Sequence, residues 1–326
     1  MGHRPILQEP RLRRLPFVSC PVRAPFRAIL IEMRAMNQQV NRWNRSWRNV
    51  DLAFGIAFGL TACLTPGKTV VDRVSGSANG STSDLTATAG GTRASAGACD
   101  LTRPIITLTY DDSLPTQLST VAPALRTHHL RATFFVVDVT SDEARWAALK
   151  ADGHELGAHT FNHPCPKSNS WVQPGKASED YSLDRMAKEL DANIAELKAL
   201  GQQAPFSFAY PCGVQWVGET HDSYVGLIKE RFAGARGVVP GVVMTLVDAY
   251  NVAATFSTGS GSDLKRVVDL AKAQNGWIVF GFHGVGGDSN AIAVDAHEEL
   301  LTYLQKQVDY VQVLPFGEAL KCVSSK

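Results

Sequence analysis

The 326-residue sequence lacks three features that would place it in common functional classes. It has almost no net charge, because 32 Lys and Arg residues oppose 31 Asp and Glu residues, so there is no electrostatic basis for a nucleic-acid partner. None of its six cysteines forms a Cys-x-x-Cys pair, which disfavours a four-cysteine zinc site. No Gly-x-Gly-x-x-Gly follows the first apolar strand, which removes the usual dinucleotide-binding site.

The sequence also has little that could cross a membrane. The apolar core of residues 51–63, Leu52 to Leu60, is shorter than the ~20 residues of a spanning helix but typical of a signal peptide. It ends in LTAC, which resembles a bacterial lipobox with Cys63 as the lipidated residue. We therefore expect export, as a cell-envelope lipoprotein or a periplasmic or secreted protein, with membrane contact only through this segment or a lipid anchor. A short internal strand is the alternative.

Composition then divides the chain into four parts. Signal peptides usually have ~15–30 residues, so we expect residues 1–35 to be an over-long N-terminal extension and residues 36–63 to be the signal peptide. Residues 64–100 are rich in Gly, Ser, Thr and Ala and predict a flexible linker. Residues 101–326 are expected to form a single catalytic domain.

Export would place four cysteines of the folded part in an oxidising compartment: Cys99, Cys165, Cys212 and Cys322. Four cysteines allow three pairings. We favour Cys99–Cys322, which joins the two ends of the domain, and Cys165–Cys212, which joins two loops. A four-cysteine zinc site is the weaker alternative.

From residue 104 onward, apolar strands alternate with amphipathic helices. The strands are expected at residues 104–110, 132–137, 153–160, 206–211, 243–255, 276–284 and 311–316, and the helices near 114–130, 142–151, 180–201, 221–232, 262–274 and 295–308. This alternation predicts a parallel sheet covered by helices. About seven units in ~220 residues favour a closed or nearly closed α/β barrel. An open, doubly wound sheet is the alternative.

Polar residues that can carry chemistry follow several of these strands: Asp111, Asp112, His159, His163, the Tyr210-Pro211-Cys212 segment and His283. The carboxyl ends of the strands form the rim where parallel α/β barrels carry their active sites. One carboxylate and two imidazoles suit Zn²⁺, with Co²⁺, Ni²⁺ or Fe²⁺ as alternatives. A second carboxylate can act as a general base and another histidine as an acid. The set predicts metal-assisted hydrolysis of an acyl group.

Each group also has a simpler explanation. Asp112 could cap the helix that begins near Pro115, and His283 could be a buried core histidine beside a glycine turn. His159 and His163 could be two unrelated histidines near a turn. Independent coincidences at three strand ends are less probable than one site.

At this point the order of the motifs resembles a known family. TYDDS at 109–113, HTFNH at 159–163, YPCG at 210–213 and FHG at 282–284 are similar to the successive motifs of polysaccharide deacetylases, the NodB-homology domains of carbohydrate esterase family 4. The resemblance covers roughly residues 103–320. It implies a distorted (β/α)7 barrel and a metal-dependent deacetylase.

The resemblance also implies a role for each matching residue. Asp111 would be the catalytic base and His283 the catalytic acid, while Asp112, His159 and His163 would hold the metal. The backbone N–H of Cys212 would donate to the developing oxyanion, and Thr160 would help to hold its loop. Tyr210, Trp277 and Phe282 would contact the substrate, the last two around the acetyl methyl group.

The sequence departs from the family pattern at several positions. Ala209 stands where an arginine normally orients the base aspartate, and we expect that Arg236 reaches in from a later loop. Ser113 and Tyr110 replace the usual Gly and Phe. Cys212 replaces an aromatic residue. The fourth motif survives at best as Asp248, and Gly284 replaces the aspartate that commonly follows the acid histidine.

The expected function is removal of acetyl groups from an N-acetylated polysaccharide or oligosaccharide, such as peptidoglycan, a chitin-type chain or poly-N-acetylglucosamine. An O-acetyl esterase of the xylan type differs only in its leaving group and stays open. The third alternative is a cell-envelope glycan-binding module with impaired catalysis.

Overall fold

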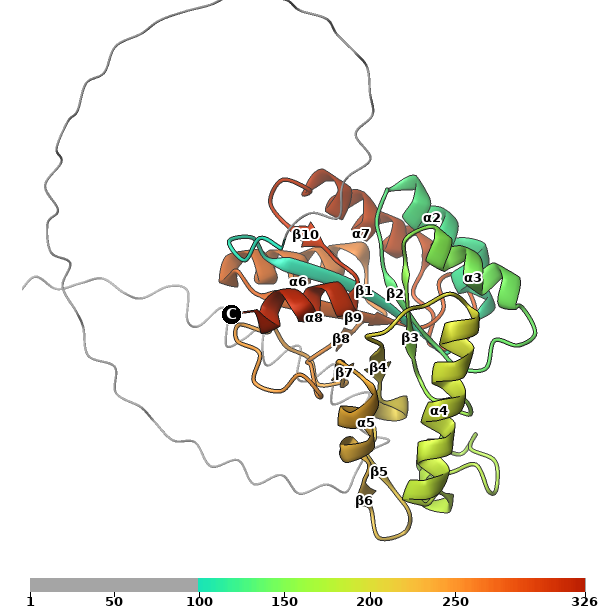
Figure 1. Cartoon of the computed structure of the whole chain (residues 1–326). Helices are drawn as coiled ribbons and strands as arrows, with labels where there is room; N and C mark the ends of the chain where they lie inside the picture. Colours follow the sequence, from blue (N-terminus) through green and yellow to red (C-terminus); the bar gives the residue numbers. More distant parts are fainter. Residues whose placement is uncertain (1–98, 326) are drawn as a thin grey trace, which may run out of the picture. The chain divides into compact units, whose positions relative to one another are not determined.

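The computed structural model in Figure 1 describes residues 99–325. The expected extension at 1–35, the signal peptide at 36–63 with the lipidation site Cys63, and residues 64–98 of the expected linker lie outside the described residues. Among the helices of residues 99–325, none combines the length and the apolar character needed to span a membrane.

Seven parallel strands form the main path of the sheet. Their order is β7-β4-β3-β2-β1-β9-β8, and a short β10 pairs with the start of β1. Figure 1 shows β1 in the middle, between β2 and β9. The strands are β1 (Ile105–Asp111), β2 (Thr133–Val136), β3 (Glu155–Ala158), β4 (Ser207–Ala209), β7 (Gly234–Arg236), β8 (Thr255–Phe256), β9 (Trp277–Phe282) and β10 (Gln312–Val313).

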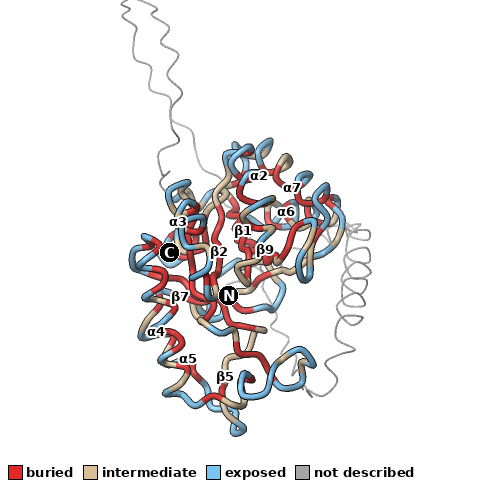
Figure 2. Tube along the Cα trace, turned by 90° about the vertical axis from the view of Figure 1, so that its right-hand side faces the viewer, coloured by how far each residue is buried: buried red, intermediate tan, exposed pale blue. Residues whose placement is uncertain are grey.

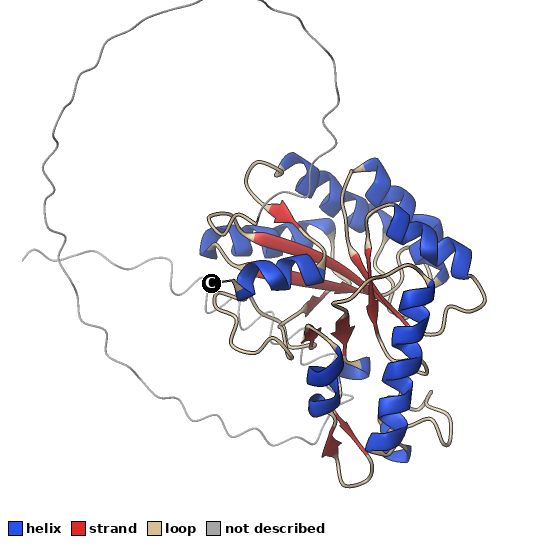
Figure 3. Ribbon diagram, viewed as in Figure 1, coloured by secondary structure: helices blue, strands red, loops and turns tan. Residues whose placement is uncertain are grey.

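Helices surround the sheet (Figure 3). They are a π-helical turn (Gln117–Val121), α2 (Ala122–Thr127), α3 (Glu143–Ala151), α4 (Leu183–Ala199), α5 (Val225–Arg231), α6 (Gly261–Gln274), α7 (Val294–Lys306) and α8 (Phe316–Ser324). A two-stranded hairpin, β5 (Trp216–Val217) and β6 (Asp222–Ser223), projects between β4 and α5 in the chain.

The sheet curls into a distorted (β/α)7 barrel, as expected, and is not an open doubly wound sheet. The strand path ends at β7 on one side and at β8 on the other, and the segment that runs into β8 links the two. Val252, just before β8, bridges Arg236 of β7, and Thr255 of β8 pairs with Phe280 of β9. The segment therefore spans the gap between the two ends of the strand path.

Period-two alternation along the strands creates two apolar cores. On β1, Ile106, Leu108 and Tyr110 belong to the core beneath the helices, whereas Ile105 belongs to a second core inside the barrel that also includes Phe316 of α8. The central strands β1, β2, β3, β4 and β9 are buried along their whole length (Figure 2). Because Asp111 lies two, four and six positions after Thr109, Thr107 and Ile105, its side chain faces the barrel interior.

Two expectations about the strands are wrong. Residues 243–255 are mostly loop, and Val247 is 95% exposed, so the apolar run read as a buried strand contributes only its last residue to β8. Conversely, Arg236 lies on β7, not on a loop. This three-residue strand begins at Gly234 and contains a buried arginine, so neither its length nor its composition signals a strand.

Both expected disulfides are present, Cys99–Cys322 and Cys165–Cys212. The first joins the start of the described region to α8, over a sequence separation of 223 residues. A crosslink over so long a loop mainly restricts the unfolded chain. The second crosslink, over 47 residues, lies in the loops after β3 and β4.

We predict that the double substitution Cys99→Ser and Cys322→Ser lowers the free energy of unfolding by about 2–5 kcal/mol. Urea denaturation under non-reducing conditions measures the change, with the secondary structure followed by circular dichroism. The reduced wild-type chain is the control and should show at least as large a loss. An unchanged unfolding midpoint in the double variant would show that this bond does not restrict the unfolded chain.

Candidate active site at the carboxyl ends of the strands

The loops that follow β1, β3 and β4 carry an unusual concentration of left-handed backbone. The φ angles are +77° at Asp112, +54° at Ser113, +61° at Thr160, +49° at His163 and +53° at Cys212. Such conformations are rare outside glycine, and in a β-branched threonine they are outliers. Strained residues persist only where the surrounding structure holds them, and they gather at functional sites.

The departures from the family pattern at positions 110 and 113 have local explanations. Ser113 adopts a φ that glycine takes freely, and its Oγ accepts a hydrogen bond from the Val137 N–H at 3.0 Å. The Tyr110 hydroxyl lies 2.7 Å from Nε2 of the buried His297. Each added polar atom therefore has a partner.

Asp111 forms a buried ion pair with Arg236. Arg236 Nη2 lies 2.5 Å from Asp111 Oδ2, and both side chains are almost fully shielded from solvent. The second carboxylate oxygen, Oδ1, has no hydrogen-bond partner within the described residues. Asp111 is thus held at one oxygen and free at the other, the arrangement that a general base needs.

The position of Arg236 relative to Ala209 is informative. Ala209 on β4 and Arg236 on β7 are paired residues of neighbouring parallel strands, so the two lie at the same level of the barrel. The guanidinium is packed between the rings of Phe135 and Phe256, at 5.1 and 4.9 Å from their centroids. The arginine expected at position 209 therefore has a counterpart one strand away, beside a small alanine.

Asp112, His159 and His163 converge at one point. Asp112 Oδ1 lies 3.4 Å from His159 Nε2 and 3.3 Å from His163 Nε2. With metal–ligand bonds of ~2.0–2.1 Å, neighbouring ligand atoms of a tetrahedral zinc site lie about 3.3–3.4 Å apart. The spacing therefore fits a Zn²⁺-sized cation.

The hydrogen bond on the other side of His159 sets its tautomer. His159 Nδ1 lies 2.8 Å from the carbonyl oxygen of Ala209, which can only accept, so Nδ1 carries the proton. In the neutral ring Nε2 then presents a lone pair toward Asp112 Oδ1, a buried oxygen with no hydrogen-bond partner in residues 99–325. Acceptors that face one another in this way need a proton or a metal cation between them, and a carbonyl behind the imidazole is the usual support of a metal ligand.

The ionisation of the cluster agrees with this interpretation. Burial raises the pKa of Asp112, but the three neighbouring imidazoles of His159, His163 and His283 outweigh it and hold that pKa below its ordinary value. Burial, aided by the neighbouring His159, lowers the pKa of His163 to about 4. At neutral pH the site thus offers an ionised carboxylate and a neutral imidazole, the forms that bind metal.

A second group of possible ligand atoms, from His163, Cys165 and Cys212, lies close by. Its two cysteines are joined in a disulfide, so neither can offer a thiolate. The expected four-cysteine alternative is excluded for the same reason, because all four cysteines are in disulfides.

Polar residues of α4, which the sequence analysis did not identify, hold the histidine loop. The amide oxygen of Asn193 accepts from the His159 N–H at 2.9 Å, and Glu189 accepts from the backbone and the side chain of Asn162. Glu196 accepts from the side chain of Asn193. Their spacing along the buried stripe of α4 is a signal visible in the sequence, since polar residues at core positions need partners.

His283 and Cys212 complete the rim. His283 Nε2 lies 3.6 Å from Asp112 Oδ2, and its ring packs against Phe256 at a centroid distance of 5.5 Å. Within residues 99–325 the carboxylate that pairs with this ring is therefore that of Asp112, since Gly284 stands in place of an aspartate. Cys212, whose backbone is left-handed, lies in the loop after β4, and its disulfide to Cys165 ties it to the histidine loop.

The side chains of the three expected substrate contacts are buried in the two apolar cores. Tyr210 and Phe282 belong to the core beneath the helices, and the Tyr210 hydroxyl donates to the carbonyl of Tyr250 at 2.9 Å. Trp277 begins β9, opposite Ile105, at the far end of the barrel, and its Nε1 donates to Thr107 Oγ1. Asp248 is also separate, as its carboxylate accepts from the Tyr250 N–H.

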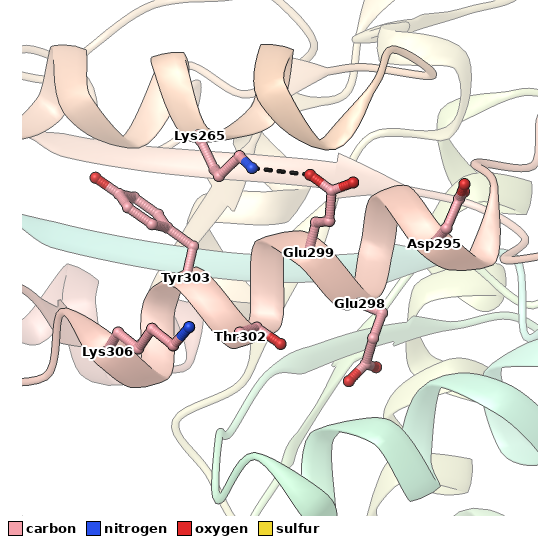
Figure 4. A pocket seen from close by; sticks show the side chains of 7 residues that line it. All are labelled: Lys265, Asp295, Glu298, Glu299, Thr302, Tyr303 and Lys306. Atoms are coloured by element: carbon pink, nitrogen blue, oxygen red, sulfur yellow. Dashed lines mark hydrogen bonds and ion pairs between the residues drawn. The ribbon is translucent and has the colours of Figure 1, made fainter.

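A surface groove along α7 is a different feature. Figure 4 shows its lining residues on α6 and α7, with the 2.8 Å ion pair between Lys265 and Glu299 across it. It contains no histidine or cysteine and none of the rim residues. We therefore place the candidate chemistry at the rim and not in this groove.

Comparison with known proteins gives a family match. Residues 99–224 match the family model described as polysaccharide deacetylase. Among solved structures, the chain is similar to the catalytic domain of a peptidoglycan N-acetylglucosamine deacetylase from Eubacterium rectale, with 18% identity, a TM-score of 0.46, and coverage of 68% of this chain and 93% of that one.

Two further structures show similar values. One is the peptidoglycan deacetylase PdaC from Bacillus subtilis, with 17% identity, a TM-score of 0.41, and coverage of 69% and 94%. The other is the Xyl-CE4 domain of a multidomain xylanase from the hindgut metagenome of Trinervitermes trinervoides, with 15% identity, a TM-score of 0.43, and coverage of 67% and 90%. No curated protein matches the chain.

We predict that His163→Ala abolishes tight binding of one Zn²⁺ per chain, because it removes one of three converging ligands. Calorimetric titration of the chelator-treated chain with ZnCl₂ measures the affinity. His221→Ala, at an exposed histidine outside the cluster, is the matched control and should bind as the wild type does. Equal affinity in the two variants would remove the metal assignment.

Proposed function

We propose that this chain, whose residues 99–224 match the polysaccharide deacetylase family model, is an active metal-dependent hydrolase that removes acetyl groups from an N-acetylated glycan. The observation that carries the proposal is the pairing of Arg236 with Asp111, 2.5 Å apart, next to the convergent Asp112, His159 and His163. The general base Asp111, held in place by Arg236, and a set of side chains that fits a metal cation therefore lie on the same rim of the barrel.

In this proposal Asp112, His159 and His163 hold a divalent cation, with Zn²⁺ first and Co²⁺, Ni²⁺ or Fe²⁺ as alternatives. The bound ion would polarise the acetyl carbonyl and make a water molecule more acidic. Asp111 accepts the proton of the attacking water at Oδ1, its free oxygen. His283, on the other side of Asp112, returns a proton to the departing amine.

The backbone N–H of Cys212 is proposed as the donor to the developing oxyanion. Donors of this kind contribute ~3–4 kcal/mol to transition-state stabilisation when they are aimed in advance. The left-handed φ of Cys212 and its disulfide to Cys165 hold that peptide in place relative to the histidine loop. The disulfide thus couples the proposed donor to the proposed metal ligands.

The alternative of an impaired binding module rested on Ala209 and on the eroded fourth motif. Arg236 weakens its first support, because the arginine that the third motif lacks has a counterpart on β7 that contacts the same aspartate. A glycan-binding module would have no need for a buried base held by a buried arginine.

We also propose that the protein is exported. The support is the pair of disulfides, Cys99–Cys322 and Cys165–Cys212, since disulfides persist mainly in oxidising compartments. A glycan of the cell envelope or of the surroundings would then be the accessible substrate. The signal peptide at 36–63 and lipidation of Cys63 belong to the same proposal.

The proposal is tested by acetate release from the full-length chain. We expect release from N-acetylglucosamine oligomers or peptidoglycan that stops on addition of a chelator and returns with Zn²⁺. Asp111→Asn should reduce the rate by at least ~100-fold, because it removes the base while keeping the shape. Release from acetylated xylan alone would assign the O-acetyl esterase. A chain that retains its metal and releases no acetate from any of these would overturn the proposal.

A second prediction concerns the displaced arginine. Arg236→Met should lower kcat by ~100-fold or more, since Asp111 loses its orienting charge. Adding Ala209→Arg to this variant should recover at least ~10-fold, because position 209 is the pair partner of 236 and its side chain faces the same interior. Circular dichroism of both variants separates a folding defect from a catalytic one. A well-folded double variant without recovery would show that Arg236 acts in some other way.

A further inference from the structure

One large aromatic side chain is exposed to solvent beside the proposed metal ligands Asp112, His159 and His163. Trp171 is 56% exposed, and its ring lies nearly parallel to the imidazole of His163, with 27° between the planes and 6.3 Å between the centroids. A tryptophan in water is costly and marks binding surfaces more often than core packing. The mechanism proposed above does not use it.

The loop that presents Trp171, between β3 and α4, is tied down at several points. The Cys165–Cys212 disulfide anchors it to the loop after β4. The Ser178 N–H donates to the Cys165 carbonyl at 2.9 Å, and Lys167 forms an ion pair with Glu219 in the turn of the β5–β6 hairpin. A ring held on such a loop can bind a ligand with little loss of conformational entropy.

The corrected positions of Tyr210, Trp277 and Phe282 make this ring more significant. All three expected aromatic contacts are packed into the apolar cores. Trp171 is the exposed aromatic residue that the described structure places against a ligand histidine.

We propose that Trp171 is the platform on which the sugar adjoining the acetylated residue stacks, so that the enzyme recognises a glycan chain and not a single acetylated sugar. This inference rests on the proposed function. A pyranose whose hydroxyls are all equatorial presents a flat face of axial C–H groups, which packs on an indole as an apolar surface. Chains of glucosamine or xylose units have this face, whereas a sugar with an axial hydroxyl has it on one side only.

The test is a comparison of chain lengths with Trp171→Ala in the full-length, metal-loaded chain. We expect KM for the N-acetylglucosamine tetramer to rise by roughly 10-fold with little change in kcat, and no change for the monomer. Trp171→Phe, which keeps an aromatic face, should stay within about 3-fold of the wild type. Acetylated xylotetraose, tested in parallel, distinguishes which all-equatorial chain is preferred.

Tyr310→Ala is the matched control. Tyr310 is 64% exposed but lies between α7 and β10, at the opposite end of the strands, so its removal should leave both constants unchanged. Zinc content of each variant is measured to exclude an indirect effect through His163. Equal losses on monomer and tetramer, or no loss on either, would overturn the platform.

A binding measurement separates this inference from the proposed function. The deacetylated glucosamine tetramer cannot be turned over, so its binding can be followed by the change in tryptophan fluorescence whether or not the chain is active. We expect a change in the wild-type chain that Trp171→Phe removes. A fluorescence change without acetate release would overturn the hydrolase proposal and leave the role of Trp171 standing. Acetate release together with an unaltered fluorescence change in Trp171→Phe would overturn the role of Trp171 and leave the hydrolase proposal standing.

Discussion

Two adjacent carboxylates, Asp111 and Asp112, lie at the end of one buried strand, and the rim depends on how their charge is balanced. Placing two carboxylates and several imidazole lone pairs away from water is unfavourable unless positive charge is close. Arg236 supplies it for Asp111 through a buried contact. Asp112 instead faces two imidazole nitrogens, an arrangement that a divalent cation would stabilise.

The surrounding structure holds this arrangement in place against its strain. Residues with left-handed backbone occur in the loops after β1, β3 and β4, and contacts with other parts of the chain hold each of these loops. Asn193 and Glu189 of α4 hold the loop after β3, and the Cys165–Cys212 disulfide ties it to the loop after β4. The positions of the metal-ligand candidates and of the Cys212 peptide are therefore linked, although the residues lie far apart in sequence.

The same restraint explains where substrate contacts can arise. Successive side chains of a β-strand point to opposite faces of the sheet, and both faces are covered by a core. Aromatic residues within the strands are therefore buried. The exposed aromatic residue of the rim, Trp171, comes from the long loop between β3 and α4, outside the strands and the motifs. Binding groups on loops supported by a rigid scaffold are the general pattern in α/β barrels.

Much of the site could be predicted from the sequence, because its information is local. The alternation of strands and helices indicated a barrel, and Asp111, Asp112, His159, His163 and His283 follow strands whose carboxyl ends must share a rim. The pairing of cysteines at the two ends of the domain followed from the same layout. For Tyr210, Trp277 and Phe282 the resemblance supplied the motif but not the depth at which each ring is buried in a core.

The amino-acid sequence by itself determined the fold class and the types of residue at the rim, since periodicity and the order of motifs are properties of neighbouring residues. Only the tertiary structure decided that Arg236 contacts Asp111 from a strand, that Asn193 supports His159 and that Trp171 lies beside His163. Each of these contacts joins residues of different elements. Their register depends on how the strands pair and how the loops close, which no local pattern encodes.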